Sequence, residues 1–140
     1  MILKFFEKTE DLNKNNNNEL INIACLMVHA AKIDENYTNK EREIIKNTLQ
    51  KLNKSNQNID KVFEDAEKRE ADANHIQEFT KNLKTMSKDS KKKLIENIWS
   101  IILSDGESDI YEENLMRRLA GLLYIDNKTM GEIKIRIKSK

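Results

Sequence analysis

The sequence predicts an all-α protein, a compact bundle of about seven to eight short helices. Three observations predict it. The chain of 140 residues contains no Pro and only three Gly, so few positions interrupt a helix. Apolar residues recur at helical spacing, and runs of Val, Thr and aromatic residues typical of strands are missing. A unit of apolar helix, acidic turn and capped helix also occurs twice, which indicates an internal repeat of one helical hairpin.

Residues 1–17 are expected to form a short helix and a polar connector ahead of one domain over residues 18–140. The apolar residues of this first helix either dock on the core or make at most a peripheral membrane contact, because so short an apolar surface binds membranes weakly alone. The Asn-rich connector has nothing to bury. The N-terminus is too soon charged for a secretory signal. The apolar residues concerned are Ile2, Leu3, Phe5 and Phe6.

The first hairpin of the domain is expected over residues 18–52. Its first helix is apolar on most sides, which predicts a central position. After the turn, Thr38 and Glu41 form a capping box: the hydroxyl accepts from a free amide at the helix start, and the Glu reaches back to the amide of Thr38. The inward positions are Leu20, Ile23, Ala24, Met27, Ala30 and Ala31 in the first helix and Ile44, Ile45, Thr48, Leu49 and Leu52 in the second.

Two connecting helices and a second hairpin follow. A helix over residues 59–71 and a helix capped by Asp72 or Asn74 are expected to close the bundle. The second of them carries the apolar residues Ile76, Phe79, Leu83 and Met86. Ser87 then caps an apolar helix that contains Ile98 and Trp99, and Asp109 with Glu112 forms a second capping box. Asp126 caps a last helix. The second hairpin repeats the first at an offset of 71 residues, the separation of Asp34 and Asp105.

Charge and composition exclude several classes of function. The net charge of +1 and the lack of aromatic residues among the lysines argue against nucleic acid as a partner. A single Cys cannot form an internal disulfide, which fits a reducing compartment, and we expect a cytoplasmic protein. No apolar run approaches the roughly 20 residues of a membrane-spanning helix. There is also no Gly-rich phosphate loop and no Ser, His and Asp arrangement for nucleophilic catalysis.

The acidic turns are the main candidates for a binding site. Asp34 and Asp105 each lie near the C-terminal end of an apolar helix, where the helix dipole disfavours a negative charge by about 0.3–1 kcal/mol. They either accept hydrogen bonds from amides of the turn or bind a divalent cation, Ca²⁺ or Mg²⁺. The spacing is not that of an EF-hand, since Ile110 and Met116 stand where that loop needs Gly and Glu. The predicted metal ligands are Asp34, Glu41, Asp105, Glu107, Asp109 and Glu112.

Other candidate residues have simpler structural explanations. Cys25 and His29 share a helical face and could supply two zinc ligands, but no second pair exists, so core positions are favoured. Trp99 and Tyr111 flank the second turn, where core packing is favoured over an aromatic contact with a partner. Gly106 is expected to take a positive φ in its turn.

These residues resemble the TerB-like family, named after a bacterial tellurite resistance protein. The resemblance covers residues 20–138, and its most specific part is the Asp105-Gly106-Glu107 turn followed by Glu112. It implies an all-α bundle, a role in tellurite or other stress resistance, and divalent metal on acidic residues. Glu35 stands where the family usually has Gly. The other matching segments are 28–34, 38–41, 71–79, 98–99, 111–114 and 122–123.

Three functional hypotheses follow. The first is a non-catalytic stress-response or regulatory module that a divalent cation on the acidic turns controls. The second is a metal-independent adaptor whose acidic surface binds a protein partner. The third is an enzyme that uses paired Asp and Glu side chains as acid and base. Such an enzyme needs a cleft, and short helices with turns at the rim rarely enclose one, so we expect no catalysis.

Overall fold

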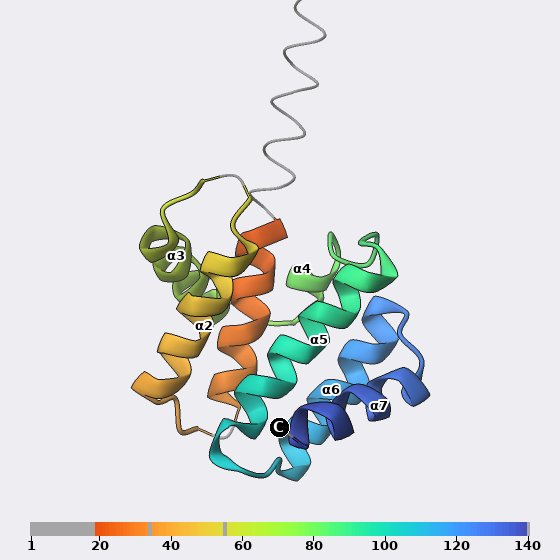
Figure 1. Ribbon diagram of the computed structural model, residues 1–140. Helices are drawn as coiled ribbons and strands as arrows, with labels where there is room; N and C mark the ends of the chain where they lie inside the picture. The colour runs from red at the N-terminus through yellow and green to blue at the C-terminus, as the bar shows by residue number, and fades with distance from the viewer. Residues whose placement is uncertain (1–18, 34, 55, 140) are drawn as a thin grey trace, which may run out of the picture.

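The computed structural model describes residues 19–33, 35–54 and 56–139, and these residues form helices and connecting loops with no strand among them (Figure 1). The prediction of an all-α bundle is therefore confirmed. The predicted N-terminal helix and connector lie outside the described residues. The elements are a helix over residues 19–32, α2 (Asn39–Leu52), α3 (Ile59–Asp72), α4 (Gln77–Thr80), α5 (Lys88–Ile102), the 3-10 turn η1 (Leu103–Asp105), α6 (Ile110–Leu123) and α7 (Asn127–Lys138).

The helix over residues 19–32 and α5 form the centre of the bundle, as their apolar sequences predict. They run in the same direction through the middle of the view in Figure 1. Both are lined with side chains that belong to one continuous core. Residues 22–28 of the first helix are all buried, and Asn22 is the polar residue among them. The equivalent helices of the two predicted hairpins therefore share the same apolar interior.

The remaining helices cover this centre. Helix α2 packs against α3 and α5, and α7 packs against α5 and α6. The Phe63 side chain of α3 is 1% exposed. Arg42 and Lys46 of α2 place their cationic groups 5.5 and 5.3 Å from the centre of the Phe63 ring. These cations add a favourable interaction with the aromatic face to the burial of the ring.

One predicted helix is much shorter than expected. The helix that Asp72 or Asn74 was expected to cap is the single turn α4, whose N-cap position is Ile76 and has no side-chain hydrogen bond. The chain continues as turns to Met86. The apolar positions still face the core, since Phe79 and Leu83 are buried. These side chains can thus be buried without a continuous helix. Their helical spacing therefore predicted a helix longer than α4.

The two hairpin turns share a left-handed residue at the same relative position. Gly106 has φ 111°, as predicted, and Glu35, which lies 71 residues earlier, has φ 64°. Glycine adopts positive φ without a steric cost, whereas a residue with a Cβ atom meets a cost of roughly 1–2 kcal/mol. The first turn therefore contains a strained residue where the second has none.

Replacing Glu35 with glycine is accordingly expected to raise the free energy of unfolding by about 1 kcal/mol, because the strain at φ 64° is removed. Urea denaturation of the two proteins measures the difference. Glu107→Gly is the matched control, since Glu107 is also an exposed loop glutamate but is not among the residues with positive φ. An equal or larger stabilisation by Glu107→Gly would contradict the explanation.

Candidate functional site

The two turns lie together at one end of the bundle, which we call the turn end and define as residues 35–41 and 103–112. The Lys40 Nζ atom, in the first turn of α2, donates a hydrogen bond of 3.1 Å to the carbonyl oxygen of Ser104 in η1. The same end of the molecule holds both loops in the lower part of Figure 1. The described parts of the two turns are thus in contact.

Both predicted capping boxes are present. At the start of α2, the Thr38 amide donates to Glu41 Oε1 at 3.0 Å, and the Glu41 amide donates to Thr38 Oγ1 at 3.1 Å. At the start of α6, the Asp109 amide donates to Glu112 Oε1 at 3.0 Å, and the Glu112 amide donates to Asp109 Oδ1 at 2.8 Å. Glu41 and Glu112 are only 8% and 4% exposed. Both carboxylates are therefore already engaged by backbone amides at the helix starts.

If Glu112 acts as a cap, Glu112→Gln should keep most of the stability, because the amide oxygen of Gln accepts the same hydrogen bond from Asp109. Glu112→Ala should lower the free energy of unfolding by about 1–2 kcal/mol, since the Asp109 amide loses its partner. Thermal and urea unfolding compare the three proteins. A Gln variant as unstable as the Ala variant would show that the negative charge matters for more than the cap.

In the described part of the chain, the other predicted metal ligands do not come together as a metal site. Glu107 is exposed, and Asp109 is half-buried and uses Oδ1 in its cap. Asp34 and the side chain of Asp105 lie outside the described residues. Among the residues that the structure does describe, no three His, Cys, Asp or Glu side chains are placed to hold a metal ion.

The second turn also exposes apolar side chains. Ile110 and Tyr111, in the first turn of α6, are 61% and 66% exposed. Trp99, by contrast, is 2% exposed. The favoured core position is therefore confirmed for Trp99 and wrong for Tyr111, which instead matches the alternative of an aromatic side chain available to a partner. Tyr111 lies in the first turn of α6, at the edge of a buried stripe that is centred on Glu112, Met116 and Leu119.

Glu113 has a role that the sequence patterns did not indicate. Its Oε1 atom accepts hydrogen bonds from Ser108 Oγ, at 2.6 Å, and from Lys134 Nζ of α7. Partial burial opposes ionisation, but the hydrogen bonds from Lys134 and Ser108 prevail and lower the pKa of Glu113. Lys134 is 21 positions away in the sequence, so local spacing alone could not reveal this ion pair.

Cys25 occupies a core position, as favoured, whereas His29 is only half-buried, so the favoured core position is wrong for His29. The Cys25 thiol is buried and its Sγ atom lies 3.6 Å from the carbonyl oxygen of Ala66. His29 Nδ1 lies 3.1 Å from Glu70 Oε1, and Lys32 Nζ lies 2.6 Å from Glu70 Oε2. A carboxylate of α3 thus orients the histidine ring. Cys25 and His29 share a helical face because both contact α3.

Burial, assisted by the charge of Glu70 and only partly opposed by Arg69, raises the pKa of the Cys25 thiol to about 12. We expect a disulfide reagent at neutral pH to label native Cys25 at least about 100-fold more slowly than the denatured chain, because the thiolate is both scarce and enclosed. The rate of colour release from the reagent measures this. Labelling of the native protein at the denatured rate would contradict the buried placement.

Comparison with known proteins identifies the family. The family model described as tellurite resistance protein TerB matches residues 20–135, which include both hairpins and both turns. The chain belongs to the TerB family. No curated protein and no solved structure matches it. The TerB match agrees with the all-α fold, and no helix in the described part of this TerB chain is long and apolar enough to cross a membrane.

Proposed function

We propose that this TerB-family chain is a non-catalytic binding module of a cytoplasmic stress response, and that it acts by binding a protein partner at the turn end. The observation that carries the proposal is the exposure of Ile110 and Tyr111 on consecutive positions of α6. Large apolar side chains exposed side by side are typical of interaction surfaces, and Tyr is enriched among the residues that dominate binding energy. Their position beside both bridged turns favours this end over other surfaces.

The chemistry of the turn end indicates the kind of partner. Glu35 and Glu107 are exposed carboxylates on the two turns, whereas the nearby Lys40 is engaged with Ser104. A partner that fits this surface presents an apolar pocket for Tyr111 and basic side chains around it. Such charge complementarity favours the encounter, and the buried aromatic contact supplies most of the affinity.

The cavities support a non-catalytic role. Two cavities in the described part of the chain, of about 340 and 390 Å³, are each lined by one carboxylate, Glu113 and Glu19 respectively, and by no His or Cys. Glu113 is paired with Lys134. The paired carboxylates of an acid–base enzyme need two such groups within reach of one substrate, and neither of these linings supplies a second carboxylate.

A pull-down from the native cell tests the proposal. Tyr111→Asn should abolish retention of the partner, whereas Tyr124→Asn should leave it unchanged. Tyr124 is the matched control because it is 74% exposed and lies at the opposite end of α6. Asn also tolerates the left-handed conformation of Tyr124, whose φ is 59°. Retention that is insensitive to Tyr111→Asn, or equally sensitive to both changes, would contradict the proposal.

A second candidate is a divalent cation held between the turns. The observation that favours it is the hydrogen bond from Lys40 to Ser104, which brings together the segments that flank Asp34 and Asp105. Carboxylate oxygens are the ligands that Ca²⁺ and Mg²⁺ prefer. Because Glu41 and Glu112 cap their helices, the cation would depend on Asp34, Asp105, Glu107 and the free oxygen of Asp109 rather than on all six predicted ligands.

Titration with Ca²⁺ or Mg²⁺, followed by amide chemical shifts, separates the two candidates. Cation binding predicts saturable shifts at the turn end that Asp105→Asn abolishes and Glu112→Gln preserves. The adaptor predicts unchanged spectra at millimolar cation and a pull-down that is insensitive to a chelator. Partner retention that is lost with the chelator and with Asp105→Asn would favour a module that depends on the cation.

A further inference from the structure

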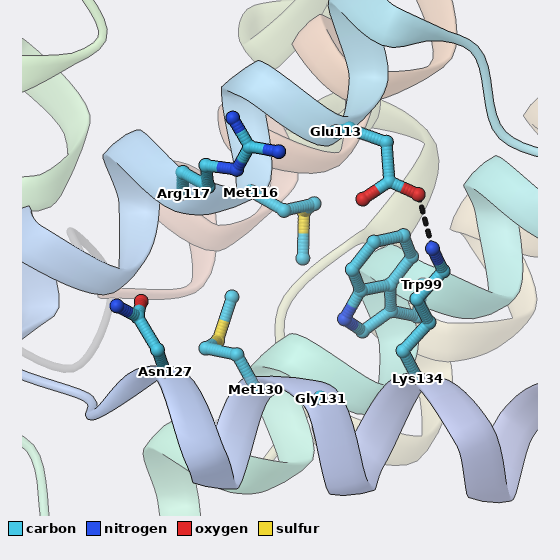
Figure 2. A pocket seen from close by; sticks show the side chains of 8 residues that line it. All are labelled: Trp99, Glu113, Met116, Arg117, Asn127, Met130, Gly131 and Lys134. Atoms are coloured by element: carbon cyan, nitrogen blue, oxygen red, sulfur yellow. Dashed lines mark hydrogen bonds and ion pairs between the residues drawn. The ribbon is translucent and has the colours of Figure 1, made fainter.

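A cavity of about 340 Å³ lies between α5, α6 and α7 (Figure 2). Its apolar wall consists of Trp99 from α5, Met116 from α6 and Met130 from α7, and all three are buried. The volume is at the small end of the range for ligand sites, about 300–1,000 Å³. Methionine side chains are flexible and polarizable, so this wall can adjust to an apolar occupant.

The floor of this cavity contains a polar atom that lacks a partner. Trp99 Nε1 is buried and has no hydrogen bond to any described residue. Figure 2 shows the nitrogen edge of the indole turned toward Met130 and the space between α6 and α7. A buried donor left unsatisfied costs about 1–3 kcal/mol. An occupant with an oxygen acceptor that displaces the Met130 side chain would remove that cost.

The charges around the cavity favour an anion. Lys134 Nζ is paired with Glu113 and lies 5.3 Å from the centre of the Trp99 ring. The second cation, Arg117, is an exposed residue whose only hydrogen bond among those observed is a long one of 3.5 Å to Asn114. The lining therefore has a net charge of +1, with two cations and one carboxylate. A planar guanidinium is suited to bind a carboxylate through two hydrogen bonds.

We propose that this cavity binds a small amphipathic carboxylate. Its apolar body packs against Trp99, Met116 and Met130, its carboxylate pairs with Arg117, and one oxygen of that carboxylate also accepts the hydrogen bond from Trp99 Nε1. Glu113 of the lining accepts a hydrogen bond from Ser108 of the turn end, but no lining residue belongs to the turn end. The proposal therefore does not depend on a protein partner or on a cation there.

Trp99 makes the test direct, because it is the only Trp in the chain. Octanoate, octylamine and 1-octanol serve as probes, each kept below the concentration at which it aggregates. Tryptophan fluorescence and the single indole N–H resonance should change saturably with octanoate. The dissociation constant for octanoate should be at least about tenfold lower than that for octylamine. Equal responses to the three probes, or no saturable response to octanoate, would overturn the proposal without reference to any variant.

Two pairs of variants locate the site. Arg117→Gln should weaken octanoate binding at least about fivefold and leave 1-octanol unaffected, whereas Arg118→Gln, a change at an exposed neighbour that does not line the cavity, should do neither. Gly131→Leu should fill the cavity and abolish binding. Its control is Gly121→Leu, since both are helical glycines with open space around an added Cβ atom but only Gly131 lines the cavity. Unchanged octanoate affinity in a folded Gly131→Leu protein would also overturn the proposal.

Discussion

Replacing Phe63 with alanine is expected to lower the free energy of unfolding by about 3–5 kcal/mol, the largest effect of any change considered for this chain. The ring is 1% exposed, so its removal loses the transfer energy of a whole aromatic side chain and leaves a cavity behind. The change also removes the ring that Arg42 and Lys46 approach, although that contribution is smaller. Urea denaturation followed by circular dichroism measures the loss.

Phe63→Leu is the matched control for this prediction. Leucine fills part of the space and stays apolar, so we expect a substantially smaller loss than for alanine. Arg42→Ala separates the contribution of the cation from that of the buried ring. A loss below about 1 kcal/mol in the Phe63→Ala protein would show that α3 contributes little to the common core.

Replacing Gly106 with valine is expected to lower the free energy of unfolding by about 2 kcal/mol. Gly106 has φ 111° and ψ −40°, a conformation that residues with a Cβ atom rarely adopt. No atom lies within 4 Å of an added Cβ, so the expected loss comes from backbone strain and not from a clash with neighbours. Thermal unfolding with a parallel urea titration gives the size of the effect.

The control for Gly106 predicts a change of opposite sign. Gly121 lies inside α6, where alanine is favoured over glycine by about 0.5–1 kcal/mol, and an added Cβ meets no neighbour. Gly121→Ala should therefore stabilise the protein, while Gly106→Ala should destabilise it. If both alanine variants were stabilised, the positive φ of Gly106 would be wrong.

The parts of the fold that could be predicted are those coded by short-range patterns. Each capping box depends on two residues three positions apart, so Thr38 with Glu41 and Asp109 with Glu112 could be recognised directly. The length of α4 could not, because the burial of Phe79 and Leu83 fits a helix and a series of turns equally well. Tertiary packing decides between the helix and the turns, and this packing cannot be inferred from the spacing of residues in one sequence.

The candidate site shows the same division. The helix starts that position Glu41 and Glu112 follow from local chemistry, and the left-handed Gly106 follows from the turn. The exposure of Tyr111 could not be predicted, because Leu115, one turn further along the same side of the helix, is buried. The link between Lys134 and Glu113 also joins residues far apart in the chain, and only the crossing of α6 and α7 brings them together.

The hydrogen bond from Lys40 to Ser104 joins residues 64 positions apart and has a mechanical consequence. It couples the beginning of α2 to the 3-10 turn that follows α5, so a displacement of one loop pulls on the other. This single exposed hydrogen bond, worth about 0.5–1.5 kcal/mol, therefore limits the independent movement of the two loops. A modification that neutralises the Lys40 amine would weaken this hydrogen bond and let the two loops move more independently.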